Sequence, residues 1–286
     1  MILVIGGTGH LGRVVVHRLL GEGQQVRVLA KGAAAATDLR EAGVELVPGD
    51  IRDRDAVMKA ADGASVIVSA AQGLAGTGRP TPATVDRDGN RHVVDAAARA
   101  SASVVLVSAV GAGPDHPNDL HRMKGEAEDY VRASTVPWTI VRGTVFAETW
   151  ADLLRSSARR SGRVQVFGKG ENPTNFVSVD DVAEAVVRAA TDQSLRGRAI
   201  DVGGPENLTF NAFARALAPG REPRHLPRLA LRLIGTLARP VQPQLARLAR
   251  TAVAIDTMDM TFDAEPSHAA YPWLQCTPVG TTQVSG

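Results

Sequence analysis

The sequence predicts an α/β protein with a doubly wound parallel sheet, and three observations support this. Short apolar strands alternate with amphipathic helical stretches through the first half of the chain. The first strand, at residues 1–5, runs directly into a glycine-rich turn and then a helical stretch at 13–22. Long loops rich in Gly and Pro, at 72–82 and 109–118, follow two central strands. Such loops are typical of the edge where an open parallel sheet binds its ligand.

The predicted elements follow one another in repeated βαβ units. Apolar β-branched runs indicate strands, and apolar residues three and four apart indicate helices. Strands are expected at residues 1–5, 25–30, 43–48, 65–71, 103–108 and 138–142. Helices are expected at residues 13–22, 53–61, 85–100, 121–134, 148–161 and 180–191.

The pattern changes near residue 205, where proline becomes frequent and strand alternation fades. We expect residues 1–204 to form a nucleotide-binding core, with 143–178 also contributing to a substrate crevice. Residues 205–286 are expected to form a small C-terminal substrate-covering lobe, in one structural unit with the core.

An Arg-rich segment of this lobe carries apolar residues at helical spacing: Leu229, Leu233, Ile234 and Leu237. They predict an amphipathic helix that buries its apolar face and keeps a solvated Arg face. The alternatives are a substrate lid and a surface for an anionic partner.

The composition fits a globular protein. Hydrophobic residues make up 44% of the 286 residues and charged residues 22%. No apolar run could span a bilayer, and the first strand leaves no room for a signal peptide. The single cysteine, Cys276, is typical of a reducing compartment. We therefore expect a cytoplasmic protein, and a net charge of +2 indicates no nucleic-acid partner. The oligomeric state is left open.

The turn after the first strand reads Gly6-Gly7-Thr8-Gly9-His10-Leu11-Gly12. It fits two glycine registers, one beginning at Gly6 and one at Gly7. Glycines allow backbone N–H groups to approach a pyrophosphate, and the following helix adds its positive N-terminal end. A purely structural turn is the alternative, but the flanking strand and helix favour a dinucleotide site of the Rossmann type.

Further motifs follow in a familiar order, and together they resemble the NmrA-like group of the atypical short-chain dehydrogenase/reductases. The motifs are Val47–Asp53, Asp88–Ala97, Val105–Ser108, Lys124–Glu128, Pro137–Gly143 and Phe176–Ala183. The resemblance covers residues 1–205 well and the remainder loosely.

This resemblance implies cofactor contacts at five places. Gly6, Gly9 and Gly12, with the backbone of Thr8, His10 and Leu11, would hold the pyrophosphate. Asp50 and Ile51 would flank the adenine, Ala70 and Ala71 would face the adenosine ribose, and Lys124 would bind the nicotinamide ribose. Gly143, Thr144 and Val145 would lie against the carboxamide.

The residues after the second strand favour NADP(H) over NAD(H). No acid occurs between Gly23 and Thr37, where an NAD site usually carries one, and Lys31 could pair with a 2′-phosphate. His10 could add a donor. The alternative is that Lys31 is a solvated loop residue.

The proton donor expected in such reductases is missing. The family places a Tyr four residues before the Lys, and this chain has Leu120 there. Tyr130 lies on another face of the same helix and is expected to pack in the core. The candidate catalytic residues are therefore Lys124, Ser108, which would polarise a carbonyl, and His121, in a capping or an acid/base role.

Three functions stay open. The favoured one is an NADPH-dependent ketoreductase of a small hydrophobic carbonyl compound, with the proton from His121, Ser108, water or the substrate. An aromatic polyketide ketone, as in antibiotic biosynthesis, fits the apolar C-terminal lobe and the GC-rich source that the Arg bias suggests. The alternatives are an NADP(H)-sensing regulator and, with less support, an epimerase.

Other chemistry lacks a pattern. The seven His show no paired ligand spacing, so no metal site is expected. Asp180 and Asp181 are expected to cap a helix N-terminus.

Overall fold

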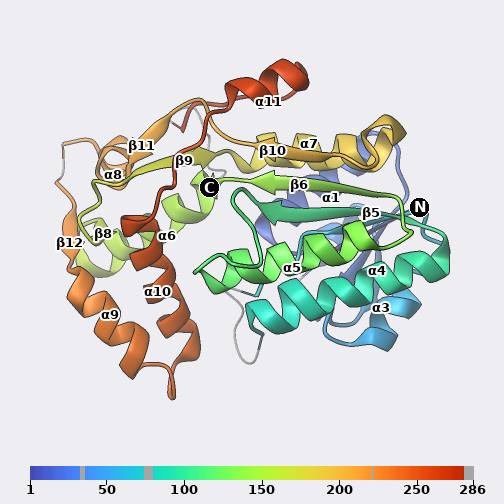
Figure 1. Ribbon diagram of the computed structural model, residues 1–286, viewed down its shortest axis with the longest axis horizontal. Coiled ribbons are helices and arrows are strands. Elements are labelled where there is room, and N and C mark those ends of the chain that lie inside the picture. Colours follow the sequence, from blue (N-terminus) through green and yellow to red (C-terminus); the bar gives the residue numbers. More distant parts are fainter. Residues whose placement is uncertain (33–35, 74–79, 221, 280–286) are drawn as a thin grey trace. The chain divides into compact units, whose positions relative to one another are not determined.

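Contacts along the chain divide it into two units (Figure 1). The computed structural model describes residues 1–32, 36–73, 80–220 and 222–279. Unit 1 comprises Met1–Gly143 and Val182–Val202, and unit 2 comprises Thr144–Asp181 and Gly203–Gly286. This division by contacts differs from the functional boundary expected at residue 205, which stays a prediction.

Unit 1 contains a seven-stranded sheet in the order β10-β6-β5-β4-β1-β2-β3, with every neighbouring pair parallel. The strands are β1 Ile2–Ile5, β2 Val26–Ala30, β3 Glu45–Pro48, β4 Val66–Ser69, β5 Ser103–Ala109, β6 Trp138–Gly143 and β10 Ala199–Val202. The predicted doubly wound sheet and its six strands are confirmed, and the short β10 was not predicted. The strand order reverses between β1 and β4, the point where such sheets bind ligands.

Helices cover both faces of this sheet. They are α1 His10–Gly21, α2 Thr37–Glu41, α3 Arg54–Ala60, α4 Asp88–Ala100, α5 Asp119–Ala133 and α7 Val179–Thr191, with short turns η2 Ala83–Arg87 and η3 Gln193–Leu195. Figure 1 shows α3, α4 and α5 as one layer along the sheet, with α1 and α7 on the other side. An ion pair of 2.9 Å between Arg18 and Glu184 joins α1 to α7. The predicted helix at 85–100 consists of η2 followed by α4.

Unit 2 has two small sheets with helices around an aromatic core. Its strands are β7 Val145–Phe146, β8 Gln165–Phe167, β9 Pro173–Val177, β11 Asn207–Thr209 and β12 Arg224–Leu226, in the orders β11-β9-β7 and β12-β8. Its helices are α6 Ala147–Ser161, α8 Phe210–Leu217, α9 Arg228–Leu237, α10 Pro243–Thr257 and α11 Glu265–Ala270. Phe176 stacks on Phe213 at 4.4 Å and meets Phe210 edge-on at 5.1 Å.

The helix α9 was predicted, but its buried face was not. Leu231 and Gly235 face α10, whereas Leu229, Leu233 and Leu237 are exposed. The expectation that these three leucines form the packing face is therefore wrong. Among the described residues, no helix is long and apolar enough to cross a membrane.

Candidate functional site

The glycine turn after β1 is packed so tightly that side chains do not fit. Gly6 has φ +88°, and a Cβ there would lie 2.7 Å from the carbonyl carbon of Ala70, beyond β4. A Cβ on Gly12 would lie 2.1 Å from the Gly6 carbonyl oxygen, so α1 packs directly on the turn. A Cβ on Gly7 would lie 2.8 Å from a methyl group of Val28. Gly6 and Gly7, which begin the two predicted glycine registers, therefore both lie where a side chain does not fit.

The N-terminus of α1 fits a pyrophosphate. Gly9 precedes the helix, and no described side chain caps it. No acid lies in the first turn, which contains His10, Leu11 and Gly12. Their N–H groups have no acceptor within the helix, so they and the positive end of the helix dipole can bind an anion. The turn and the helix start thus meet the requirements of a dinucleotide cofactor.

Lys31 forms an ion pair with a carboxylate that lies outside the stretch between Gly23 and Thr37. The parallel pairing of β2 with β3 brings the Lys31 Nζ to 3.3 Å from Asp50 Oδ2. Arg52 donates to both oxygens of Asp50, at 3.1 and 2.8 Å. Burial disfavours the charged form of Asp50, but Arg52 and Lys31 outweigh it and hold the pKa of Asp50 well below its usual range. The three side chains leave one net positive charge.

Arg52 was missed as a candidate, although it lies only two residues after Asp50 in the loop that follows β3. The neighbouring Ile51 is buried in the core, where it packs against Gly89 of α4. A contact from Ile51 to an adenine would therefore come from its backbone. Ala70 and Ala71 follow β4, beside the glycine turn.

Lys124 is buried on α5 and has two partners. Its Nζ donates to the Val107 carbonyl oxygen at 3.0 Å and lies 3.2 Å from Asp86 Oδ1. Asp86 is fully buried, which raises its pKa, while Lys124 acts in the opposite direction. The Gly73 N–H donates to its second oxygen at 2.8 Å. An ammonium has three N–H donors, so one stays available for a ligand.

Asp86 was missed because the sequence contains no signal that separates it from Asp88 in the same stretch. Asp88 pairs with Arg87 at 2.7 Å in a partly exposed position. Only the tertiary structure shows which of the two acids lies against Lys124.

Ser108 provides a hydroxyl near the end of β5. The side chain is buried, and its Oγ has no hydrogen-bond partner among the described residues. Ser69, at the end of β4, differs because its Oγ donates to Asn90 at 2.6 Å. A buried hydroxyl without a partner is uncommon in proteins. Ser108 can therefore donate to a ligand oxygen without breaking a protein hydrogen bond.

His121 lies in the first turn of α5, which Asn118 caps. Its ring stacks on His116 at 4.4 Å with an interplanar angle of 20°. Burial, with smaller effects of His116 and Lys124, lowers the pKa of His121 to about 4. The imidazole is therefore neutral near pH 7. An imidazolium acid at this position is not supported.

Tyr130 does not replace the donor that is missing at Leu120. Tyr130 is exposed and donates to Asp95 at 2.9 Å, so the expectation that it packs in the core is wrong. Its position six residues after Lys124 turns it toward α4 and solvent. Tyr271 lies in unit 2 beside Trp273, with ring centroids 5.6 Å apart.

The residues expected at the carboxamide belong to both units, Gly143 to unit 1 and Thr144 and Val145 to unit 2. Gly143 ends β6, and its carbonyl oxygen accepts from the Val110 N–H at 3.0 Å. In unit 2, Thr144 donates to Asn175 Oδ1 at 2.9 Å, and Val145 opens β7. Their predicted contact with the carboxamide stays a prediction.

The start of α7 corrects the predicted cap at Asp180 and Asp181. Ser178 Oγ accepts from the Asp180 N–H at 3.2 Å, and Glu148 accepts from both Ser178 Oγ and the Val179 N–H at 2.9 Å. Asp181 instead binds the backbone and hydroxyl of Thr277.

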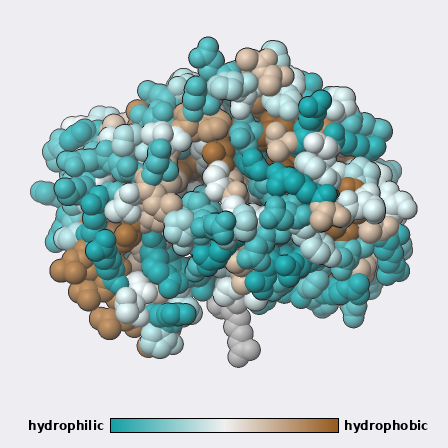
Figure 2. Space-filling model, in the orientation of Figure 1, coloured by the Kyte–Doolittle hydropathy of each residue, from teal (hydrophilic) through white to brown (hydrophobic). Residues whose placement is uncertain are grey.

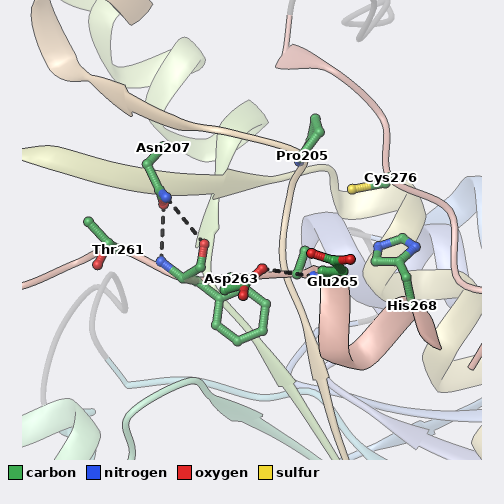
Figure 3. Close-up of a pocket in the computed structure, with 9 residues that line it drawn as sticks. Pro205, Asn207, Thr261, Asp263, Glu265, His268 and Cys276 are labelled. Carbon is green, nitrogen blue, oxygen red and sulfur yellow. Dashed lines mark hydrogen bonds between the residues drawn. The ribbon is translucent and has the colours of Figure 1, made fainter. Parts of the chain in front are cut away.

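An open cavity of about 570 Å³ lies in unit 2 (Figure 3). It contains none of the predicted site residues. Its lining includes Asp263, Glu265, His268 and Cys276. No group of three such side chains in the described part of the chain could hold a metal ion. The predicted cofactor-binding and catalytic residues of unit 1 lie near its strand ends, and none of them lines this cavity.

Comparisons with known proteins identify an NAD(P)H-binding family. A family model described as NAD(P)H-binding matches residues 6–193. An NAD(P)H azoreductase of Xenophilus azovorans is 30% identical over 231 residues, which cover 79% of this chain and 76% of that protein. A (4-alkanoyl-5-oxo-2,5-dihydrofuran-3-yl)methyl phosphate reductase of Streptomyces griseus is 36% identical over 213 residues, covering 73% and 70%.

A solved structure shares the fold. The NADPH complex of the quinone oxidoreductase QOR2 from Escherichia coli has a TM-score of 0.77 at 19% identity. The match covers 98% of this chain and 97% of that one.

Proposed function

The chain belongs to the NAD(P)H-binding, NmrA-like family of atypical short-chain dehydrogenase/reductases, and from this premise we propose that it is an NADPH-dependent reductase of a small hydrophobic carbonyl compound. The observation that carries the proposal is the pair formed by buried Lys124 and the unpartnered hydroxyl of Ser108. Both side chains lie near the end of β5, and Lys124 donates a hydrogen bond to the carbonyl oxygen of Val107, the residue before Ser108. The names of the two relatives, an azoreductase and a dihydrofuran phosphate reductase, also favour reduction.

The residues of unit 1 would divide the work as follows. The N-terminus of α1 and the glycines before it would hold the pyrophosphate. Lys124 would use its remaining N–H on the nicotinamide ribose. Ser108 would donate to the carbonyl oxygen, where negative charge develops during reduction. The bound nicotinamide supplies the hydride.

The proton must come from a source other than a tyrosine. Leu120 has no proton to give, and the low pKa of His121 leaves its ring neutral. We therefore favour an ordered water or an acidic hydroxyl on the substrate itself, such as a phenol beside the ketone. Polyketide-like aromatic ketones carry such phenols, and they also fit the apolar character of the C-terminal residues.

Leu120 also supports a second candidate, a non-catalytic sensor of NADP(H). A sensor needs the cofactor site but no proton donor. It would bind NADPH through the same glycine turn and pass the binding state to a protein partner.

The test measures NADPH oxidation with two matched aryl ketones, one with a phenol beside the carbonyl and one without. We expect turnover with the first and a much lower rate with the second. Lys124→Ala should reduce the rate strongly, whereas His121→Phe should retain most of it. Loss of turnover in His121→Phe with intact NADPH binding would identify His121 as the donor. Tight NADPH binding without oxidation by any carbonyl compound would favour the sensor.

A further inference from the structure

We propose that the hairpin formed by α9 and α10 docks on an anionic lipid surface. The proposal begins with an exposed apolar stripe on this hairpin. The exposed fractions are 70% for Leu229, 52% for Leu233, 71% for Leu237, 80% for Val241 and 44% for Leu245. Figure 2 shows strongly hydrophobic side chains gathered where Figure 1 places α9.

The stripe is not an unfinished part of the core. Leu229, Leu233 and Leu237 are four residues apart, so they share one face of α9. Leu231 and Gly235 occupy the opposite side, where a Cβ on Gly235 would lie 3.0 Å from Arg250 of α10. The helix has therefore used one face for packing and leaves a second apolar face in solvent. Contiguous exposed apolar residues of this kind mark interaction surfaces.

The charge around the stripe has one sign. Six arginines and no acid occur between residues 223 and 255: Arg224, Arg228, Arg232, Arg239, Arg247 and Arg250. Arg228 pairs with Asp256. Arg232 and Arg239 are exposed and have no carboxylate partner in the described ranges. Arg232 lies roughly a quarter turn from the leucine stripe on α9, and Arg239 follows the end of that helix at Leu237.

Arg247 of α10 lacks hydrogen-bond partners among the described residues at two of its nitrogens. Its Nε and one terminal nitrogen are buried and have no hydrogen-bond partner in the part of the chain that the structure describes. Guanidinium groups bind phosphate through paired N–H donors. The exposed Arg232 and Arg239 therefore offer donors for phosphates beside leucines that can enter an apolar layer.

This combination fits a bilayer better than a second copy of the chain. Two copies pairing through the stripe would bring the arginines of both hairpins together. An anionic bilayer instead accepts leucines at the boundary between head groups and acyl chains and attracts arginines to its phosphates. The hairpin would lie on the surface, because neither helix is long enough to span it.

The test is flotation of the full chain with vesicles of phosphatidylcholine, with or without an equal amount of phosphatidylglycerol. We expect binding to the anionic vesicles, weaker binding at high salt, and little binding to phosphatidylcholine alone. The variant L229S/L233S/L237S should bind about tenfold less or weaker still, because it removes the apolar contact. Urea unfolding of this variant checks that it is folded, since all three positions are exposed.

Matched charge variants separate the hairpin from the overall charge. R232Q/R239Q should reduce binding by about tenfold or more, whereas R99Q/R196Q removes the same charge from exposed sites of unit 1 and should have little effect. Equal losses in both variants would overturn the proposal. So would the absence of vesicle binding, or a dimer in solution that the triple serine variant converts to a monomer.

Discussion

Unit 1 and unit 2 treat their charged side chains differently. In unit 1 the buried Lys124 lies against the fully buried Asp86, so both members of this pair are enclosed. In unit 2 the buried Asp256 binds Arg228, which is partly exposed, and Arg232 of α9 faces solvent. An enclosed pair holds one arrangement firmly, whereas an exposed one can accept an external anion. The difference indicates that unit 1 is built to fix a cofactor and unit 2 to present surfaces.

A second ion pair of unit 1, between buried Glu128 and partly exposed Arg142, also connects α5 to the sheet. Glu128 lies one helical turn after Lys124 on α5, and Arg142 lies on β6. Their hydrogen bonds, at 2.5 and 2.9 Å, fix α5 against the sheet. Lys124 is therefore held by its own contacts with Val107 and Asp86 and by the attachment of the next turn of α5 to the sheet.

The largest effect on cofactor affinity is expected where the backbone of unit 1 is most crowded. Gly12→Ala places a Cβ 2.1 Å from the Gly6 oxygen, so α1 must move away from the turn that would hold the pyrophosphate. We expect NADPH affinity to fall by about 100-fold or more, which corresponds to about 3 kcal/mol, measured by titration calorimetry. Gly21→Ala is the matched control in the same helix, since its Cβ meets no described atom within 4 Å. Equal affinity of the two variants would contradict this view of the turn.

The largest effect on the free energy of unfolding is expected when one partner of an enclosed pair is removed. Asp86→Asn leaves the Lys124 ammonium buried without a counter-charge, and loss of such a partner typically destabilises by about 3–5 kcal/mol. Urea unfolding, followed by a signal from unit 1, measures this loss in the free energy of unfolding. Asp88→Asn, in the same stretch but partly exposed, should change the free energy of unfolding by less than about 1 kcal/mol. Similar losses in both variants would show that burial does not distinguish them.

The corresponding change in unit 2 sharpens the comparison. Asp256 accepts from the N–H groups of Lys169 and Gly170 and from Arg228. Asp256→Asn should destabilise unit 2 by about 1–3 kcal/mol, less than the change in unit 1, because Arg228 can turn to water. NADPH affinity serves as the control, because unit 1 should bind unchanged. A loss in unit 2 larger than that of Asp86→Asn would break the comparison.

A smaller effect on cofactor affinity is expected at the exposed cations of unit 1. Lys31→Ala should weaken NADPH binding by about 1–3 kcal/mol while hardly changing NADH, because only NADPH carries the 2′-phosphate. Arg52→Ala should act in the same direction, and Lys59→Ala, at an exposed position of α3, serves as the control. Calorimetry of both cofactors measures these differences. Equal affinities for NADPH and NADH in the unmodified protein would contradict the preference.

Regular elements of the fold were predictable, and contacts of single side chains were not. The six central strands and the helices α1, α3, α4 and α5 were found because fully buried apolar runs and helical spacing are local properties. The short helix α2, Thr37–Glu41, was not predicted. The strand β10 escaped notice because four residues give little pattern. The helix α9 was found at the right place with the wrong buried face, since both of its faces carry leucines.

The sequence by itself determined the glycine turn, the parallel sheet and the family. A positive φ at Gly6, close packing at Gly12 and apolar periodicity are demands that a short stretch of chain makes on its own residues. The tertiary structure alone decided that Asp50 lies against Lys31, that Asp86 lies against Lys124, and that the leucines of α9 face solvent. These outcomes depend on which distant segment returns to each side chain, and the spacing of residues along one segment contains no information about its partner.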